Sequence, residues 1–305
     1  MGLGTLIHDL LSPVLESISP LMPGEIFPIF FFEMGMGQRA LIAAILVTVV
    51  SGFLGSFLLI RNLALIGDGL AHVSFGGVAV GLVLGATAPL WYALVFSLIA
   101  AILIFELQSR ELLTGDASIA IFLTGMLGLG LVILRVFGGG ITADIEGYLF
   151  GNLLLIDDSS LDLVATISII ALVILIVIKP ILLATTIDPL AARVQGLPVR
   201  AIGLLFSVIT AAVVVSMVQI VGALLVTALL VTPAATGQLV GRSFRSCLIW
   251  TQFFGLFTVM LGLYVSSELR SGSGSTIALV AAMVFAFVAI LQGFRRLAKP
   301  EENLN

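Results

Sequence analysis

Long runs of apolar residues, separated by short polar or turn-rich breaks, dominate the pattern along the chain. Windows of about 20 apolar residues recur, which is the length that a helix needs to cross the hydrocarbon core of a bilayer. Nine such spans are predicted, over residues 39–60, 64–86, 89–107, 117–135, 161–179, 201–218, 219–240, 247–266 and 275–294. Only Gln219 separates the sixth span from the seventh, so an eight-span arrangement stays open. The pattern predicts an all-α polytopic membrane protein.

The segments outside the spans divide the chain further. Residues 1–36 contain four prolines and scattered acids, and we expect them to lie at the outer membrane interface without crossing it. Residues 37–296 then form the transmembrane domain, in which residues 180–200 are the longest inner loop. Residues 297–305 are expected to form a cytoplasmic tail.

The basic residues predict the orientation, because Lys and Arg collect on the cytoplasmic side of short loops. With nine spans and the N-terminus outside, ten of them fall inside: Arg61, Arg110, Lys179, Arg193, Arg200, Arg242, Arg245, Arg295, Arg296 and Lys299. Only Arg39, Arg135 and Arg270 fall outside. We therefore expect a protein of the plasma or inner membrane with its C-terminus in the cytoplasm. Acids gather on the outer side, where Asp144 and Glu146 belong to a predicted acidic mouth that would concentrate cations.

Composition excludes several classes of protein. Hydrophobic residues make up 60% of the chain and charged residues 10%, whereas soluble domains carry roughly a quarter of their residues as charge. The formal net charge of -4 leaves no basic stripe for nucleic acid, which is therefore not an expected partner. No Walker sequence is present, so any ATP must be bound by another subunit. We find no hydrolase motif, and predict no catalytic residue and no bound cofactor.

The second span contains the strongest candidate for chemistry. Asp68 and His72 are four residues apart, which on a helix brings both side chains to one face within about 6 Å. A charge in hydrocarbon costs at least roughly 2.5 kcal/mol, so it requires a reason. A carboxylate and an imidazole can bind zinc, manganese or ferrous iron. The alternative is that Asp68 caps the helix or pairs with Arg61 while His72 donates to a backbone carbonyl, and the spacing alone leaves both readings open.

Small residues and proline predict how two of the spans pack. Gly77, Gly81 and Gly85 recur every fourth residue, which predicts a smooth stripe for a neighbouring helix. In the seventh span, Pro233 removes a backbone hydrogen bond and predicts a kink that nearby threonine hydroxyls would support.

The longest inner loop contains the signals of a short helix. Asp188 is a capping residue, Pro189 follows at the first helical position, and Gly196 is a stop signal. We expect this helix, including Ala192, to dock on a cytoplasmic partner. An ordinary connector is the alternative, although adjacent spans need less chain than this to be joined.

Four segments in order resemble the permease subunits of ATP-binding-cassette (ABC) importers for zinc, manganese and iron. They are GSFLLIRNLALIGDGLAHVSFGGVAVG, YLFGNLL at 148–154, DPLAARVQGLPV and VGALLVTALLVTPAAT, within a likeness that runs from about residue 30 to about residue 295. The family pattern in the first segment is an arginine, then a glycine-aspartate pair, then a histidine four residues after the aspartate. The chain departs from the family at SELRSGSGST, where members often have an aspartate followed by proline and glycine.

The resemblance implies a type II ABC importer permease. It implies a homodimer of permeases around a central path, a cytoplasmic ATPase dimer that binds ATP, and an external metal-binding protein. It also implies that Asp68 and His72 contact the ion in transit, and that the loop from Asp188 to Gly196 is the coupling helix that receives the motion of the ATPase.

The function expected from these observations is import of zinc, manganese or iron ions through the bilayer. Two alternatives stay open: a permease for a metal chelate or vitamin, and a proton-coupled carrier that needs no ATPase.

Overall fold

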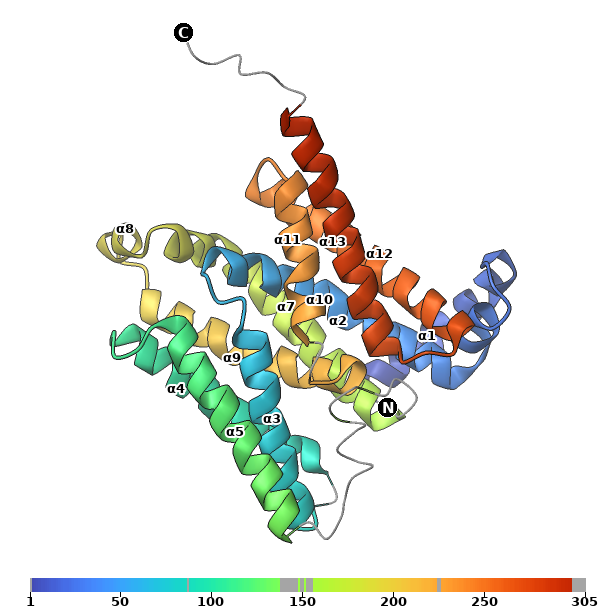
Figure 1. Ribbon diagram of the computed structural model, residues 1–305, viewed down its shortest axis with the longest axis horizontal. Coiled ribbons are helices and arrows are strands. Elements are labelled where there is room, and N and C mark those ends of the chain that lie inside the picture. Colours follow the sequence, from blue (N-terminus) through green and yellow to red (C-terminus); the bar gives the residue numbers. More distant parts are fainter. Residues whose placement is uncertain are drawn as a thin grey trace.

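Helices make up the whole regular structure of the described residues (Figure 1). The computed structural model describes residues 2–86, 88–137, 148, 151, 156–223 and 226–297. The N-terminal part contains α1 (Leu3–Ile18), η1 (Ser19–Leu21) and η2 (Ile29–Glu33). The long helices are α2 (Gly35–Ile60), α3 (Ile66–Val83), α4 (Pro89–Ser109), α5 (Gly115–Phe137), α7 (Asp158–Ile187), α9 (Val199–Val221), α12 (Phe244–Leu269) and α13 (Ser273–Leu297). The remaining short helices are α8 (Pro189–Val194), α10 (Val226–Leu230) and α11 (Thr232–Val240).

Eight helices in the described part of the chain are long and apolar enough to cross a bilayer, which confirms the predicted fold class. They match every predicted span except the seventh, whose residues form α10 and α11. Gln219 does not mark a turn, because α9 continues to Val221 and ends at Gly222, whose φ of 85° suits glycine. The seventh span is divided at Val231, and Pro233 stands in the first turn of α11, where its missing N–H breaks no helix hydrogen bond.

The broken helix α10–α11 still returns the chain across the bundle. α9 begins beside the end of α4, where Arg200 pairs with Glu106. Phe244 at the start of α12 packs on Phe57 near the end of α2, with ring centroids 4.9 Å apart, whereas Glu268 at the other end of α12 bonds to the N-terminal segment. The chain therefore crosses between α9 and α12. We call the end of the bundle that holds α8 the α8 end, and the opposite one the α1 end.

Two groups of helices flank a central one (Figure 1). α3, α4 and α5 pack together on one side and α11, α12 and α13 on the other, with α2, α7 and α9 between them. The most enclosed helices are α2, α3 and α9, in which 83%, 78% and 72% of the apolar stretch is buried, compared with 22% in α5 and α13. α3, which contains Asp68 and His72, is therefore an inner helix of the bundle.

Glycines allow α4 to lie close against α3. A Cβ at Gly77 would stand 2.7 Å from the carbonyl oxygen of Tyr92 in α4, and one at Gly81 would stand 3.1 Å from the Tyr92 ring. Gly85 does not belong to this contact: it follows the end of α3 with a φ of 70° and has open space around it. Gly85 therefore ends the helix, because other residues are strained in that conformation.

α7 is longer than the span predicted over 161–179. It passes through Pro180 and ends at Ile187, so the first part of the predicted loop 180–200 is helical. Leu182 and Thr185 in this extension are buried, and their packing stabilises a helix that the proline alone would disfavour.

Hydrogen bonds attach the start of the N-terminal segment to α7 and α2. The backbone N–H of Thr5 in α1 donates to Asp162 of α7 at 2.7 Å. The hydroxyl of Ser12 in α1 donates to the side chain of Gln38 in α2 at 2.8 Å. α1 is thereby fixed along the α1 end of the bundle.

The end of the same segment is attached to α12 through one carboxylate. Oε1 of Glu268 accepts the backbone N–H groups of Glu25, Ile26 and Phe27, at 3.0, 2.9 and 3.0 Å. Three donors converge on one oxygen, so residues 24–27 are held in a fixed turn. The N-terminal segment therefore links α7 to α12.

Replacing Glu268 with alanine should release this turn. Without the carboxylate, three backbone N–H groups lose the acceptor that protects them from exchange with solvent. We expect backbone amide exchange at Glu25, Ile26 and Phe27 to rise at least about tenfold in Glu268→Ala, measured by hydrogen exchange with mass spectrometry. The control is Glu25→Ala, which removes a neighbouring exposed carboxylate. Unchanged exchange in Glu268→Ala would contradict this account.

Candidate metal site and docking surface

Asp68 stands in the first turn of α3, where the helix N-terminus favours a carboxylate. Its Oδ1 accepts a hydrogen bond from the hydroxyl of Thr227 in α10 at 2.5 Å. The alternative pairing with Arg61 does not form: Nε of Arg61 donates to the hydroxyl of Thr186 at 3.2 Å. Asp68 is half-buried, so the carboxylate is held by one neighbour and still accessible.

His72 lies one turn further along α3, on the same face. The residue is 8% exposed, and its Nδ1 is buried without a hydrogen-bond partner among the described residues. A buried polar atom left unpaired costs about 1–3 kcal/mol. Asp68 and His72 thus lie one turn apart on the same helix, as their spacing predicts, and Nδ1 of His72 is a buried atom without a partner among the described residues.

The pair offers few ligands for a metal ion. In the described part of the chain, no group of three or more His, Cys, Asp or Glu residues could hold a metal. Structural metal sites are usually closed by four protein ligands, whereas an ion in transit must be held weakly enough to leave. Asp68, His72 and the neighbouring hydroxyl of Thr227 therefore suit transient binding better than a permanent site.

Thr227 is the member of this site that sequence reasoning missed. The threonines of the seventh span are expected to support the kink at Pro233, and Thr236 does bond to the carbonyl of Thr232 at 2.8 Å. Thr227 instead donates to a carboxylate 159 positions earlier in the chain. No local pattern connects two residues so far apart.

The short helix α8 has the local structure that its sequence predicts. Asp188 caps it by accepting the N–H groups of Leu190 and Ala191, at 3.1 and 2.9 Å. Pro189 fills the first turn, and Gly196 follows the helix with a φ of 78°.

The exposed surface of α8 is apolar, but Ala192 is not part of it. Leu190 is 72% exposed and Val194 is 89% exposed, beside Ile187 at the end of α7. Ala192 is 2% exposed, which corrects the expectation that it faces a partner. Its small side chain packs inward and lets α8 lie close to the bundle.

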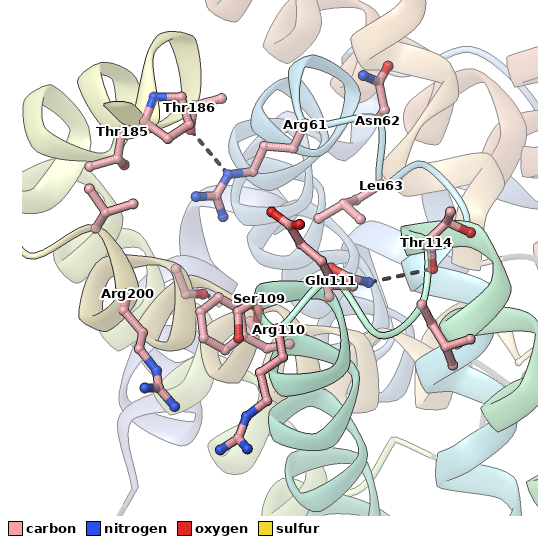
Figure 2. Close-up of a pocket in the computed structure, with 18 of the residues that line it drawn as sticks. Arg61, Asn62, Leu63, Ser109, Arg110, Glu111, Thr114, Thr185, Thr186 and Arg200 are labelled. Atoms are coloured by element: carbon pink, nitrogen blue, oxygen red, sulfur yellow. Dashed lines mark hydrogen bonds between the residues drawn. The ribbon is translucent and has the colours of Figure 1, made fainter. Parts of the chain in front are cut away.

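A cavity of about 1010 Å³ opens at the α8 end, between the ends of α2, α4 and α7 and the start of α9 (Figure 2). Its basic lining residues are Arg61, Arg110, Arg193 and Arg200. Glu106 pairs with Arg110 at 3.0 Å and with Arg200 at 2.5 Å. Several of the arginines assigned to the inner side by sequence therefore surround one cavity.

The predicted acidic mouth, Asp144 and Glu146, lies outside the described residues. Other acids of the α1 end serve local structure. Asp157 caps α7, and hydrogen bonds from Ser160 lower the pKa of Asp157. Asp158 pairs with Arg39 at 2.6 Å.

Comparison with known proteins identifies the class. The chain matches the ABC 3 transport family over residues 33–292. It is 32% identical to the manganese import system permease protein ScaB of Streptococcus gordonii, over 81% of this chain and 88% of that protein. It is 33% identical to the manganese transport system membrane protein MntC of Halalkalibacterium halodurans, over 84% of this chain and 89% of that protein.

A solved structure supports the same assignment. PsaBC from Streptococcus pneumoniae, determined in complex with a Fab, superposes with a TM-score of 0.78 at 31% identity, covering 90% of this chain and 99% of that chain. The helical fold and these relatives define a multi-pass membrane subunit of an ABC importer, a transport component and not an enzyme. The chain belongs to the ABC 3 transport family.

Proposed function

We propose that this chain is the permease through which an ABC importer carries manganese ions across the plasma membrane. The observation that carries the proposal is the Asp68 and His72 pair: a carboxylate and an unpartnered imidazole nitrogen, one turn apart on an enclosed helix. The manganese permeases among its relatives favour manganese as the cargo. Carboxylate and imidazole also suit zinc and iron, which therefore remain competing cargoes for the test below.

The α8 end faces the cytoplasm in this proposal, and the α1 end faces outward. Its support is the group of four arginines around the cavity at the α8 end, because basic residues are retained on the cytoplasmic side. The N-terminal segment then lies at the outer membrane surface, where the exposed leucines of α1 meet lipid. They are Leu3, Leu6, Leu10 and Leu11.

The partners follow from the same arrangement. An ATPase dimer docks on α8, whose exposed apolar side chains have no covering element among the described residues. An external binding protein delivers the ion to the α1 end. Asp144 and Glu146, which are outside the described residues, would attract it by their charge. A second copy of the permease completes the path and supplies ligands beyond those that the described residues of one copy offer.

The two alternatives fit the site less well. A chelate or vitamin arrives with its metal already coordinated, and would not require the free nitrogen of His72. A proton-coupled carrier would not require the exposed Leu190 and Val194 on a capped helix.

Removing the imidazole should strongly reduce manganese uptake. Loss of one ligand from so small a site is expected to lower uptake at limiting manganese by at least about tenfold, since even outer partners of a metal ligand contribute that much to affinity. The measurement is radioactive manganese uptake in cells whose other manganese importers are deleted, comparing His72→Ala with the wild type. Competition by zinc and iron in the same cells identifies the preferred cargo.

His8→Ala is the matched control, because His8 is the other histidine of the chain and belongs to α1. It should transport normally. Wild-type uptake by His72→Ala, at equal amounts of inserted protein, would refute the assignment of His72.

Charge on the exposed side of α8 should prevent docking of the ATPase. We expect Leu190→Glu combined with Val194→Glu to reduce both copurification of the ATPase and manganese uptake at least about tenfold, because buried apolar anchors carry most of the binding energy of an interface. Leu112→Glu adds one carboxylate at an exposed leucine between α4 and α5 and should leave both unchanged. Undiminished copurification of the doubly substituted chain would exclude α8 as the docking surface.

A further inference from the structure

Arg61 occupies an unusual position at the α8 end. It follows the last residue of α2 and is half-buried. Its guanidinium carbon lies 4.9 Å from the centroid of the Phe206 ring in α9, and its Nε donates to the hydroxyl of Thr186 in α7. Figure 2 shows the side chain reaching across the cavity to Thr186. Among the described residues, no carboxylate forms an ion pair with Arg61. A hydroxyl and an aromatic ring therefore hold this arginine.

The partner hydroxyl stands next to α8. Thr186 is in the last turn of α7, two residues before Asp188, which caps α8. The hydroxyl of Thr186 donates to the carbonyl of Leu182 at 2.6 Å, which orients its lone pairs for the N–H of Arg61. A displacement of α8 therefore moves the acceptor of Arg61 with it.

On its other side, Arg61 is joined to α3 by a short, hydrogen-bonded turn. Asn62 has a φ of 56°. The N–H of Leu63 donates to the carbonyl of Leu58 in α2 at 2.9 Å, and the N–H of Ile66, the first residue of α3, donates to the carbonyl of Leu63 at 3.1 Å. Asp68 follows in the first turn of α3. This turn is short and hydrogen-bonded, so a displacement of Arg61 would also move the start of α3 and with it Asp68.

The cavity gives this connection room to move. Arg61, Thr185, Thr186 and Pro189 are among the residues that line it. Arg61 therefore joins the α7–α8 junction to the α2–α3 turn at this cavity, and the Phe206 ring packs against its guanidinium.

We propose that Arg61 is a positioning residue that transmits the movement of α8 to α3, and so couples the ATPase to the Asp68 and His72 pair. The inference rests on the proposed function, in which α8 docks on the ATPase and α3 binds the ion. A purely structural arginine, retained only as a positive charge at the cytoplasmic surface, would not depend on the hydroxyl of Thr186.

The test is the number of manganese ions transported per ATP hydrolysed, measured in vesicles that contain the full importer. Thr186→Val keeps the shape of the side chain and the charge of Arg61 but removes the acceptor. We expect Thr186→Val and Arg61→Gln each to lower this ratio about fivefold or more. Fivefold is the lower end of the factors by which coupled sites typically affect each other. The rate of ATP hydrolysis and the manganese concentration at half-maximal uptake should stay unchanged. Because both changes break the Arg61–Thr186 hydrogen bond, the doubly substituted chain should be no worse than Arg61→Gln alone.

Thr185→Val is the matched control: it removes the neighbouring hydroxyl, which bonds to the carbonyl of Leu182 within its own helix. The proposal is overturned if Thr186→Val retains the wild-type ratio, if the two effects multiply, or if Thr185→Val lowers the ratio equally. It is also overturned if half-maximal uptake shifts at an unchanged ratio. If the wild-type importer transports manganese and the α8 substitutions abolish docking of the ATPase, any of these outcomes refutes only the role of Arg61 and leaves the proposed function standing. Absence of transport by the wild type would remove the proposed function itself.

Discussion

Hydrocarbon cannot hydrate a carboxylate or an imidazole, and this constraint determines how the bundle is built around α3. Asp68 is tolerated because it stands in the first turn of the helix and accepts a hydrogen bond from Thr227. Thr227 is available because the seventh apolar stretch is not one straight helix: it is divided at Val231, and its first half, α10, lies against the start of α3. The Nδ1 of His72 is one of five buried side-chain atoms that lack a hydrogen-bond partner among the described residues, and it is the one that lies one turn from Asp68. The folded protein therefore stabilises the carboxylate of Asp68 and still leaves the pair short of ligands, so that it can bind an ion.

Charged residues have different structural roles at the two ends of the bundle. At the α1 end, carboxylates fasten the N-terminal segment: Asp162 holds α1, and Glu268 holds the turn before η2. At the α8 end, arginines surround a cavity, and Arg61 adds a hydrogen bond between the end of α2 and the end of α7. Cavities occur at both ends: one of about 1010 Å³ lies at the α8 end, and two of about 480 and 510 Å³ lie at the α1 end.

Local patterns account for most of what the sequence predicts correctly. Runs of apolar residues locate the long helices, and the signals at Asp188, Pro189 and Gly196 delimit α8, because each acts within a few residues. The spacing of Asp68 and His72 places them on one face for the same reason. One error concerns a local helix end and the other concerns tertiary packing. Gln219 is inside α9, since Gly222 provides the turn, and Ala192 packs inward where an exposed residue is expected. The partners Thr227 and Thr186 could not be found from sequence, because they come from helices far along the chain.

The central claim, that His72 coordinates the ion beside Asp68, is tested most directly by electron-nuclear double resonance of manganese bound to the importer. The permease would be labelled with nitrogen-15 histidine and assembled with unlabelled ATPase, so that the label enters two positions only. The account predicts a nitrogen-15 coupling typical of direct coordination, which persists in His8→Ala and disappears in His72→Ala. A coupling that is absent from the wild type, or that survives in His72→Ala, would contradict it.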